Sequence, residues 1–417
     1  MELAKQRAAG SGSEHMDTLV AHSGVESHVE NAPMAAPIHM ATTYTRPADG
    51  EYLADDYIYS RNDNPTRLLL ENEVGLLECR GKTVGTESPI VSCAFSSGMM
   101  AVSSILLAHS APTRVLMPHD LYHGVPTVCL DVFTRFGVTT QRVDMMDPAA
   151  VCDAIDRAPG NEDVIVWIES PSNPQCQVID IHEMCRAVRQ TRNAKLTVVV
   201  DSTMAPPTIT QPLLLGADIS MHSGTKYLGG HSDALLGIAT ASPWTSRGAE
   251  IGPRLKQVQI AVGGVASAMD SWLTLRGLRT LAVRVSRQSK TALHLATFLE
   301  EHPLVEEVHY PGLVSHPNHD VAKIQMKTGA GGVLSLEMPD ENRAMALAGA
   351  LLTIKRATSL GGTESVIEHR ASIEPEGRKV SPPGLLRLSV GLEDADDLVA
   401  DLDRALLISE AVCSGNA

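Results

Sequence analysis

The chain has 417 residues, of which 43% are hydrophobic, and a formal net charge of -15 at pH 7. This length predicts two or three domains, and no run approaches the roughly 20 apolar residues of a membrane-spanning helix. No basic stripe offsets the negative charge, which argues against nucleic acid and anionic membranes as partners. The seven cysteines and sixteen histidines show no metal-ligand spacing. We therefore expect reduced thiols, a cytoplasmic location and no metal site.

The N-terminal part of the chain has little hydrophobic periodicity. Residues 1–16 are polar and rich in glycine and serine, without the apolar segment of a secretory signal, and we expect a disordered tail. Residues 17–69 contain many Pro, His, Thr and Tyr residues. They are predicted to form an extended arm rather than a folded unit.

Residues 70–264 alternate apolar runs with helical patterns, which predicts an α/β domain built from βαβ units. Three of the runs are rich in β-branched residues and continuous rather than alternating. This is the pattern of parallel strands that are buried on both faces. The three runs span residues 164–168, 196–200 and 217–221.

Residues 265–417 have a different pattern of helical and strand-like segments, which predicts a smaller α+β domain. We expect a long helical region, two strands and a final amphipathic helix with Leu398, Leu402 and Leu406 on one face. In chain order these elements span residues 266–301, 332–338, 385–390 and 395–412.

Polar residues follow two of the predicted strands at their carboxyl ends, where α/β sheets bind ligands. Asp201 comes directly after one of them. Its carboxylate could pair with a pyridinium nitrogen, or it could be a solvated turn residue. The loop 169–174 contains two prolines that could aim Asn173. The segment 94–100 is a small-residue turn before a helical pattern, which suits either a phosphate at a helix N-terminus or an ordinary serine cap.

Lys226 lies among hydroxyl residues and glycines, directly after an apolar run. At the edge of a core, desolvation lowers the pKa of a lysine and frees its amine to attack a carbonyl. The hydroxyls of Ser223 and Thr225 could hold a phosphate, so the segment suggests a Schiff base to pyridoxal phosphate. On this segment alone, a lysine that extends along an apolar surface at a helix start is an equally good interpretation.

A set of segments, in this order and spacing, resembles the pyridoxal-phosphate enzymes of cysteine and methionine metabolism, the cystathionine γ-synthase/γ-lyase family. The resemblance covers about residues 18–410. The segments that carry it are 57–66, 95–99, 120–122, 169–174, 201–203, 222–233, 275–278, 310–313, 359–362 and 386–391. It implies an α/β protein of fold type I, with a central, mostly parallel sheet, a smaller C-terminal α+β domain and an extended N-terminal arm.

The resemblance also implies a catalytic role for each matching residue. Lys226 forms the Schiff base with pyridoxal phosphate and later moves protons, while Asp201 pairs with the pyridine nitrogen. Tyr122 stacks on the ring, as an aromatic face suits a flat ring, and assists as acid or base. Asn173 contacts the hydroxyl side of the ring.

A second group of residues is implied to hold the phosphate and the substrate. The phosphate site comprises Gly98, Met99, Ser223 and Thr225, completed by Tyr59 and Arg61 of a neighbouring subunit. The resemblance therefore implies at least a dimer and usually a homotetramer. The residues themselves favour a site shared between chains, since an arginine without a local partner on an extended arm is best explained by a phosphate on the next subunit. Arg387 holds the α-carboxylate of the substrate, aided by Ser359, with Thr358 beside it.

The sequence departs from the family pattern at positions that bear on the substrate. Thr127 and Thr358 stand where members that handle cystathionine often have an arginine and a glutamate, which suggests a less charged distal pocket. Gly124 stands where members that cleave methionine often have a cysteine. Arg370 follows His369 where the family commonly has a proline.

The leading hypothesis is a γ-replacement in which cysteine displaces the γ-substituent of an activated homoserine, as in a cystathionine γ-synthase. Elimination of cystathionine or methionine, and γ-substitution of O-acetylhomoserine by another nucleophile, are alternatives. A non-catalytic homologue should have lost Lys226, Asp201 or Arg387, and all three are present. The partners expected are therefore a small amino-acid substrate and further copies of the chain.

Overall fold

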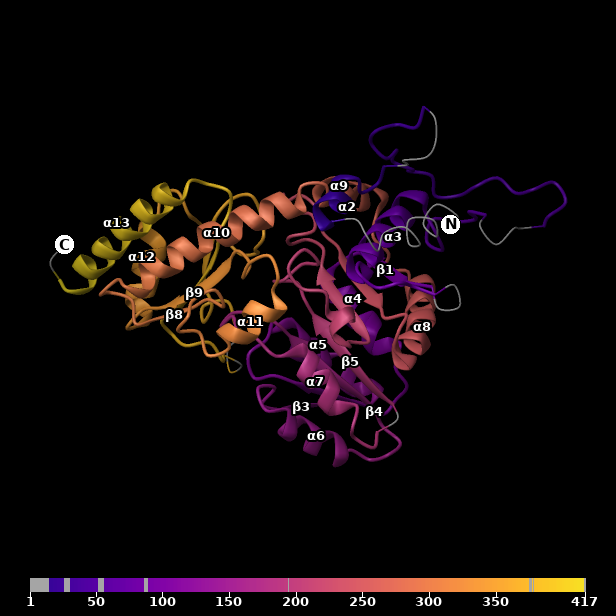
Figure 1. Cartoon of the computed structure of the whole chain (residues 1–417), viewed down its shortest axis with the longest axis horizontal. Helices are drawn as coiled ribbons and strands as arrows, with labels where there is room; N and C mark the ends of the chain where they lie inside the picture. The colour runs from indigo at the N-terminus through magenta and orange to yellow at the C-terminus, as the bar shows by residue number, and fades with distance from the viewer. Residues whose placement is uncertain are drawn as a thin grey trace.

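The computed structural model describes residues 15–25, 31–51, 56–85, 89–193, 195–374, 377 and 379–415. Most of the predicted tail, residues 1–14, lies outside the described residues. Figure 1 shows two lobes, with the C-terminal lobe reached through the long helix α10. Within the described ranges, none of the helices has both the length and the apolar character needed to cross a membrane.

The larger lobe is built around a seven-stranded sheet with the order β1-β7-β6-β5-β4-β2-β3. Only β7 runs antiparallel to its neighbours, so the sheet is mostly parallel as expected. All residues of β4 and β5 are buried, which explains their continuous apolar runs. The strands are β1 (Val91–Phe95), β2 (Thr113–Met117), β3 (Val138–Arg142), β4 (Asp163–Glu169), β5 (Leu196–Asp201), β6 (Ile219–Ser223) and β7 (Gly237–Ala241).

Helices cover both faces of this sheet. Ile165 and Trp167 of β4 belong to a core with α4, α5 and α8, whereas Val164, Val166 and Ile168 pack with α6 and α7. Side chains of β4 thus alternate between two cores. The helices of this lobe are α3 (Pro65–Cys79), α4 (Gly98–Leu107), α5 (Gly124–Asp131), α6 (Pro148–Asp156), α7 (Ile181–Val188) and α8 (Ser246–Val262), with short 3-10 turns η1 (Phe133–Phe136) and η2 (Pro212–Leu215).

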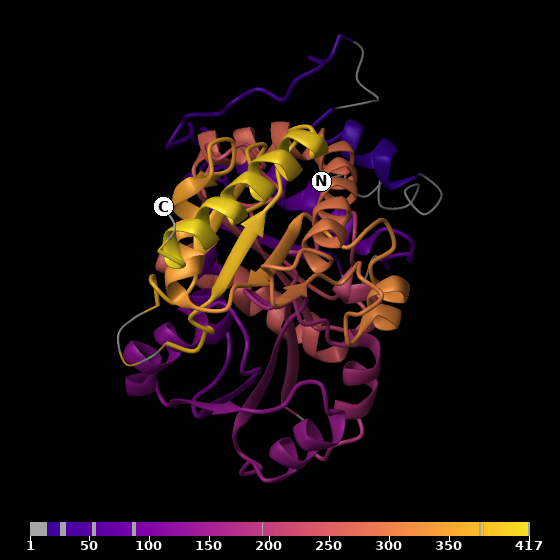
Figure 2. The same cartoon turned by 90° about the vertical axis from the view of Figure 1, so that its left-hand side faces the viewer.

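The C-terminal lobe contains a five-stranded sheet with the order β10-β11-β12-β9-β8, and α10, α12 and α13 pack on it (Figure 2). Leu398, Leu402 and Leu406 are buried on α13, as the sequence predicts. The strands are β8 (Glu307–His309), β9 (Val333–Glu337), β10 (Lys355–Arg356), β11 (Val366–His369) and β12 (Leu385–Ser389). The helices of this part of the chain are α9 (Ala268–Leu278), which packs on α3 of the larger lobe, and α10 (Leu281–Glu300), α11 (His319–Gln325), α12 (Glu341–Ala350) and α13 (Ala395–Cys413).

Three elements differ from the sequence expectations. The helical region 266–301 is two helices, because the chain leaves helical geometry at Thr280, and α9 packs on α3 while α10 reaches the C-terminal lobe. A short helix, α2 (Met16–Ala21), forms in the segment expected to be tail and arm, since Leu19 and Val20 are buried. Finally, α3 begins at Pro65, because the Asn64 side chain accepts hydrogen bonds from the first turn.

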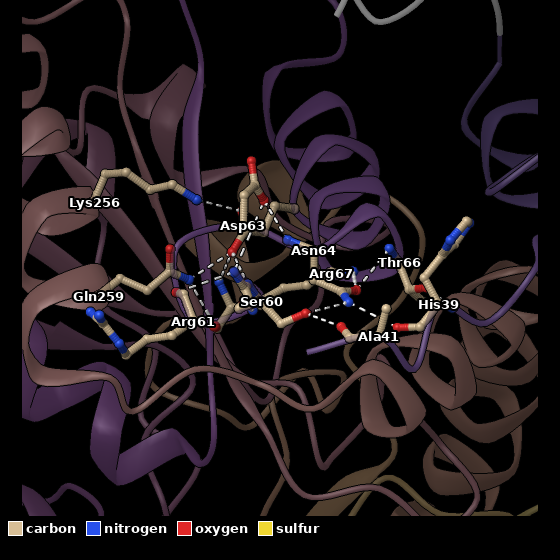
Figure 3. A network of polar contacts seen from close by, with 12 residues as sticks. His39, Ala41, Ser60, Arg61, Asp63, Asn64, Thr66, Arg67, Lys256 and Gln259 are labelled. Carbon is tan, nitrogen blue, oxygen red and sulfur yellow. Dashed lines mark hydrogen bonds and ion pairs between the residues drawn. The ribbon is translucent and has the colours of Figure 1, made fainter. Parts of the chain in front are cut away.

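A buried charged network fixes the arm to its own lobe (Figure 3). Glu71 is 2% exposed; it accepts a hydrogen bond from Gln259 Nε2 at 2.7 Å and lies 3.0 Å from Lys256 Nζ. Arg67 lies 3.6 Å from Glu71 and donates to the carbonyl of Ser60 at 2.7 Å. The arm segment around Ser60 is thereby held against α3 and α8.

Replacing Glu71 with alanine is expected to destabilise the protein by about 3–5 kcal/mol, because Arg67 and Lys256 would lose a buried counter-charge. Urea unfolding measures the loss. The control is Asp153→Ala, which removes an exposed partner of Arg157 and should change the stability by less than about 1 kcal/mol. Equal effects of the two substitutions would contradict the importance of the buried network.

Candidate active site

A cavity of about 240 Å³ lies at the carboxyl ends of β4, β5 and β6 and is closed by residues of the second sheet. It brings together most of the residues singled out from the sequence. These are Gly98, Met99, Tyr122, Asn173, Asp201, Ser223, Thr225, Lys226, Thr358, Ser359 and Arg387. Tyr59 and Arg61 do not line it. A larger cavity of about 580 Å³ lies elsewhere and contains none of these residues.

Lys226 follows β6, and its Nζ donates a hydrogen bond to Ser359 Oγ at 2.7 Å. Burial, together with the positive charge of Arg387, lowers the pKa of Lys226 to about 8. A substantial fraction of the amine is therefore neutral near physiological pH. This is the environment that a lysine needs to attack a carbonyl group.

Ser359 ties this lysine to the second sheet. Its φ of 85° lies in the left-handed region, which residues other than glycine rarely adopt. The conformation is held from both sides, since Ser359 Oγ accepts from Lys226 and its carbonyl accepts from Arg387 Nη2 at 2.9 Å. Backbone strain that is held by its surroundings is typical of functional sites.

Arg387 is buried on β12 and has one unsatisfied donor. Its Nη1 donates to Asn173 Oδ1 at 3.0 Å, and its Nη2 lies 2.8 Å from Glu368 Oε2. Its Nε is buried and has no hydrogen-bond partner among the described residues. Burial lowers the pKa of Arg387 to about 10. An anionic ligand in the cavity would satisfy the remaining donor.

Asp201 lies at the end of β5 on the opposite side of the site. Its Oδ1 accepts two hydrogen bonds from Thr203, from the backbone N–H at 3.0 Å and from Oγ1 at 2.6 Å. Both bonds use Oδ1, so Oδ2 is available to a ligand. Burial raises the pKa of Asp201, against the effects of Thr203 and His222. A cationic nitrogen in the cavity would favour the carboxylate form.

Glu169, at the end of β4, was not singled out as a site residue from the sequence. Its carboxylate accepts the backbone N–H of Tyr122 at 3.0 Å and that of Asn173 at 2.7 Å. Burial and then the charge of Asp201 raise the pKa of Glu169, whereas these N–H donors lower it. The residue thus fixes the two loops that carry Tyr122 and Asn173. From the sequence, its position at the carboxyl end of a predicted strand could have identified it as a site residue.

The ring of Tyr122 depends on a glycine beside it. A Cβ at Gly124 would lie 2.5 Å from Tyr122 Cε1, so this ring position requires the absence of a side chain at residue 124. Burial raises the pKa of Tyr122, and its hydroxyl therefore stays protonated over the physiological range. An aromatic face and a protonated hydroxyl are both available to a ligand.

The N-terminus of α4 forms another wall of the cavity. Ser97 caps the helix by accepting from Met100 N at 3.0 Å, and the N–H groups of Gly98 and Met99 have no partner within the helix. A Cβ at Gly98 would lie 3.1 Å from Ser223 Oγ, so the absence of a side chain brings these groups close together. Such a cradle suits an anion.

The hydroxyl group of Thr225 already makes two hydrogen bonds within the protein. Its Oγ1 donates to the carbonyl of Leu236 at 3.2 Å and accepts from Leu236 N at 3.0 Å. The side chain therefore fixes the loop before β7 in addition to lining the cavity.

Tyr59 and Arg61 lie on the surface of the arm. Arg61 Nη1 donates to the carbonyl of Ile260 at 2.5 Å, and the guanidinium lies 5.8 Å from the centroid of the Tyr59 ring. Arg61, which was expected to have no local partner, thus has a hydrogen-bond partner in a distant part of its own chain. The docking of the arm onto α8 keeps both residues away from the cavity of this chain.

The low pKa of Lys226 gives a measurable reactivity. In the protein freed of bound ligands, the rate of acetylation of Lys226 by acetic anhydride should rise with pH, with a midpoint near 8. The reason is that only the neutral amine reacts, and burial favours that form. Mass spectrometry of the Lys226 peptide measures the rate, and the Lys226→Arg variant is the control. A midpoint near the ordinary lysine value of about 10.4 would contradict this environment.

A family model described as Cys/Met metabolism PLP-dependent enzyme matches residues 17–407. The chain is 37% identical over 397 residues to a cystathionine gamma-lyase of Bacillus subtilis (strain 168), covering 93% of this chain and 98% of that protein. It is 36% identical over 410 residues to a cystathionine gamma-synthase of Mycobacterium tuberculosis (strain CDC 1551 / Oshkosh), covering 97% and 100%.

Solved structures agree with these sequence matches. The crystal structure of metB from Corynebacterium glutamicum has a TM-score of 0.85 at 34% identity, covering 95% of this chain and 99% of that chain. A cystathionine gamma synthase from Xanthomonas oryzae pv. oryzae in complex with cystathionine has a TM-score of 0.84 at 33% identity, with coverages of 95% and 99%. The fold type I interpretation is confirmed, and the chain belongs to the pyridoxal-phosphate (PLP)-dependent enzymes of cysteine and methionine metabolism.

Proposed function

We propose that this enzyme catalyses γ-replacement on an activated homoserine, with cysteine as the nucleophile and cystathionine as the product. The observation that carries the proposal is the low-pKa amine of Lys226 in one cavity with Asp201, Tyr122 and Arg387. Among the relatives, proteins named cystathionine gamma-synthase match this chain over nearly its whole length.

The cavity residues fit pyridoxal phosphate at both ends. Lys226 would bond to its aldehyde carbon, and the free Oδ2 of Asp201 would meet its pyridine nitrogen. Tyr122 would stack on its ring, and Asn173 would lie near its hydroxyl side. The phosphate would be held by Gly98, Met99, Ser223 and Thr225. When bound, the group supplies an electron sink for the breaking Cα–H bond.

The chain's own residues would bind the amino acid and move its protons. Arg387 would hold the α-carboxylate, because a buried guanidinium with a free donor suits a planar anion, and Ser359 and Thr358 line the same wall. Once the amino group of the substrate has replaced it at the aldehyde carbon, the released Lys226 amine, whose pKa is about 8 in this cavity, can accept a proton from one carbon atom of the substrate and return it to another. The protonated hydroxyl of Tyr122 is the candidate acid.

Elimination is the second candidate function. It is favoured by the relatives named cystathionine gamma-lyase and cystathionine beta-lyase, which are 37% and 38% identical to this chain. In that reaction no nucleophile is added: the side-chain substituent leaves as a thiol, and water hydrolyses the remaining unsaturated amino acid to a 2-oxo acid and ammonia. A methionine-cleaving activity and substitution of O-acetylhomoserine by another nucleophile use the same residues.

A product assay separates these reactions. The purified holoenzyme is incubated with O-acetyl-, O-succinyl- or O-phosphohomoserine, with and without cysteine, and separately with cystathionine and methionine. Mass spectrometry should detect cystathionine from at least one activated homoserine only when cysteine is present. Formation of 2-oxo acids from cystathionine alone, with no cysteine-dependent product, would replace the synthase assignment with a lyase.

Arg387→Ala is expected to raise the KM for the amino acid by about 30-fold or more, since breaking one side of a buried charged pair costs about 2–5 kcal/mol. Bound cofactor, measured by its visible absorption, should stay near the wild-type level. Arg387→Lys keeps the charge and should lose less affinity. An unchanged KM in the alanine variant would mean that another residue anchors the α-carboxylate.

We further propose that the active site is shared between subunits of a homotetramer. The motivation is that Tyr59 and Arg61 lie on an exposed arm and outside the cavity of their own chain. In an assembly of this kind, both residues would complete the phosphate cradle of a neighbouring subunit.

Mixing inactive Arg61→Ala and Lys226→Ala proteins should restore part of the activity. A hybrid dimer would contain one site that has both Arg61 and Lys226. Subunit exchange is first verified with differently tagged chains, and each variant alone is the control. If the exchanged mixture stays as inactive as its components, Arg61 acts within its own chain.

A further inference from the structure

Arg370 is a charged residue of the active-site cavity that the proposed mechanism does not use. It follows β11, is 2% exposed and lines the cavity together with Tyr122 and Lys226. The departures at Thr127 and Thr358 led us to expect a less charged distal pocket. The structure differs from that expectation, because Arg370, which comes from a different part of the chain, brings a positive charge to the cavity.

The guanidinium of Arg370 is only partly satisfied. Its Nη1 lies 2.6 Å from Glu368 Oε2. Its Nε and Nη2 are buried and have no hydrogen-bond partner in the part of the chain that the structure describes. Buried donors of a charged group are costly to leave unpaired. Arg387, the proposed anchor of the α-carboxylate, likewise has a buried Nε without a hydrogen-bond partner among the described residues.

A continuous chain of contacts links Arg370 to Lys226. Glu368 lies directly opposite Arg387 in the pairing of β11 with β12, and its Oε2 contacts both arginines. Arg387 in turn binds the carbonyl of Ser359, whose Oγ accepts from Lys226. The two arginines therefore share one wall of the cavity, with Arg387 between Lys226 and Arg370.

The positive charge of Arg370 acts on the side chains of Tyr122 and His123. Burial shifts the pKa of both groups, upward for Tyr122 and downward for His123, and the next largest effect on each comes from Arg370. Among the charges that shift the pKa of Lys226 are Arg387 and Glu368. Arg387 and Arg370 both line the cavity, so one ligand that carries two anionic groups can meet both guanidinium groups.

We propose that Arg370 forms a second anion-binding subsite, which selects amino acids whose side chain ends in a carboxylate or a phosphate. This inference rests on the proposed function in one respect, namely that Arg387 takes the α-carboxylate. The free Nε and Nη2 of Arg370 form an edge that can bind two oxygens of one anion. The subsite would favour acidic acyl or phosphoryl esters of homoserine over neutral ones.

The competing explanation is that Arg370 only neutralises Glu368 and so positions Arg387. That role would affect every amino acid equally, because all of them use the α-carboxylate. The subsite role affects only ligands with a second anion. A matched set of unreactive amino acids therefore separates the two explanations.

The test measures dissociation constants by calorimetry with the holoenzyme. The ligands are norleucine, 2-aminoadipate and 2-amino-5-phosphonopentanoate, which share a three-carbon chain and end in a methyl group, a carboxylate and a phosphonate, respectively. Wild-type enzyme should bind at least one acidic ligand more tightly than norleucine, and the preferred one identifies the anion. Arg370→Gln should reduce this preference by about 10- to 100-fold, while norleucine binding changes little.

Two controls keep the result interpretable. Arg157→Gln removes an exposed arginine and should leave the preference unchanged. If Arg370→Gln loses cofactor or unfolds, Arg370→Lys keeps the charge without the two-pronged edge and should still lower the preference. Equal weakening of all three ligands, or a wild-type preference in the variants, would overturn the subsite. The binding measurements do not depend on the result of the product assay. If that assay identified a lyase, the proposed role of Arg370 would therefore remain unaffected.

Discussion

The burial of the Lys226 amine is the constraint on which the rest of the site depends. A lysine that loses its hydration favours the neutral form, and here the pKa falls to about 8. The amine still needs a hydrogen-bond partner, and Ser359 of the C-terminal lobe supplies it at 2.7 Å. The same serine is bound by Arg387 through its carbonyl. One contact therefore couples the strand ends of the large sheet to the β-sheet of the small lobe.

The main elements could be predicted from the sequence because they are encoded locally, whereas most cavity residues were predicted through the resemblance to the family. The continuous apolar runs of β4 and β5, and polar residues such as Asp201 directly after a strand, carry their own signal. Features that depend on distant pairing could not be predicted. Glu368 contacts Arg387 because the two residues pair across β11 and β12. The carbonyl group that binds Arg61 comes from α8, far away in the sequence. The break between α9 and α10 follows from the packing of these helices on different lobes. Alpha-2 was missed because its single turn and a half has too few residues for a periodic pattern.

The residues proposed to hold the cofactor and those proposed to select the substrate lie in different parts of the cavity. The former sit at strand ends and at the start of α4, where backbone geometry fixes them. The latter come from the C-terminal lobe and from the loop around Tyr122, where single side chains decide charge and space. Thr127 lies on α5 and does not line the cavity, whereas Gly124 sets the ring position of Tyr122 and Arg370 adds a cation.

The central claim is that Lys226 is the residue that bonds to pyridoxal phosphate. The most direct measurement is borohydride reduction of the holoenzyme, followed by peptide mapping by mass spectrometry. The account predicts that the reduced cofactor mass appears on the peptide containing Lys226 and is absent from the Lys226→Ala protein. A label on another lysine, or no covalent label at all, would contradict it.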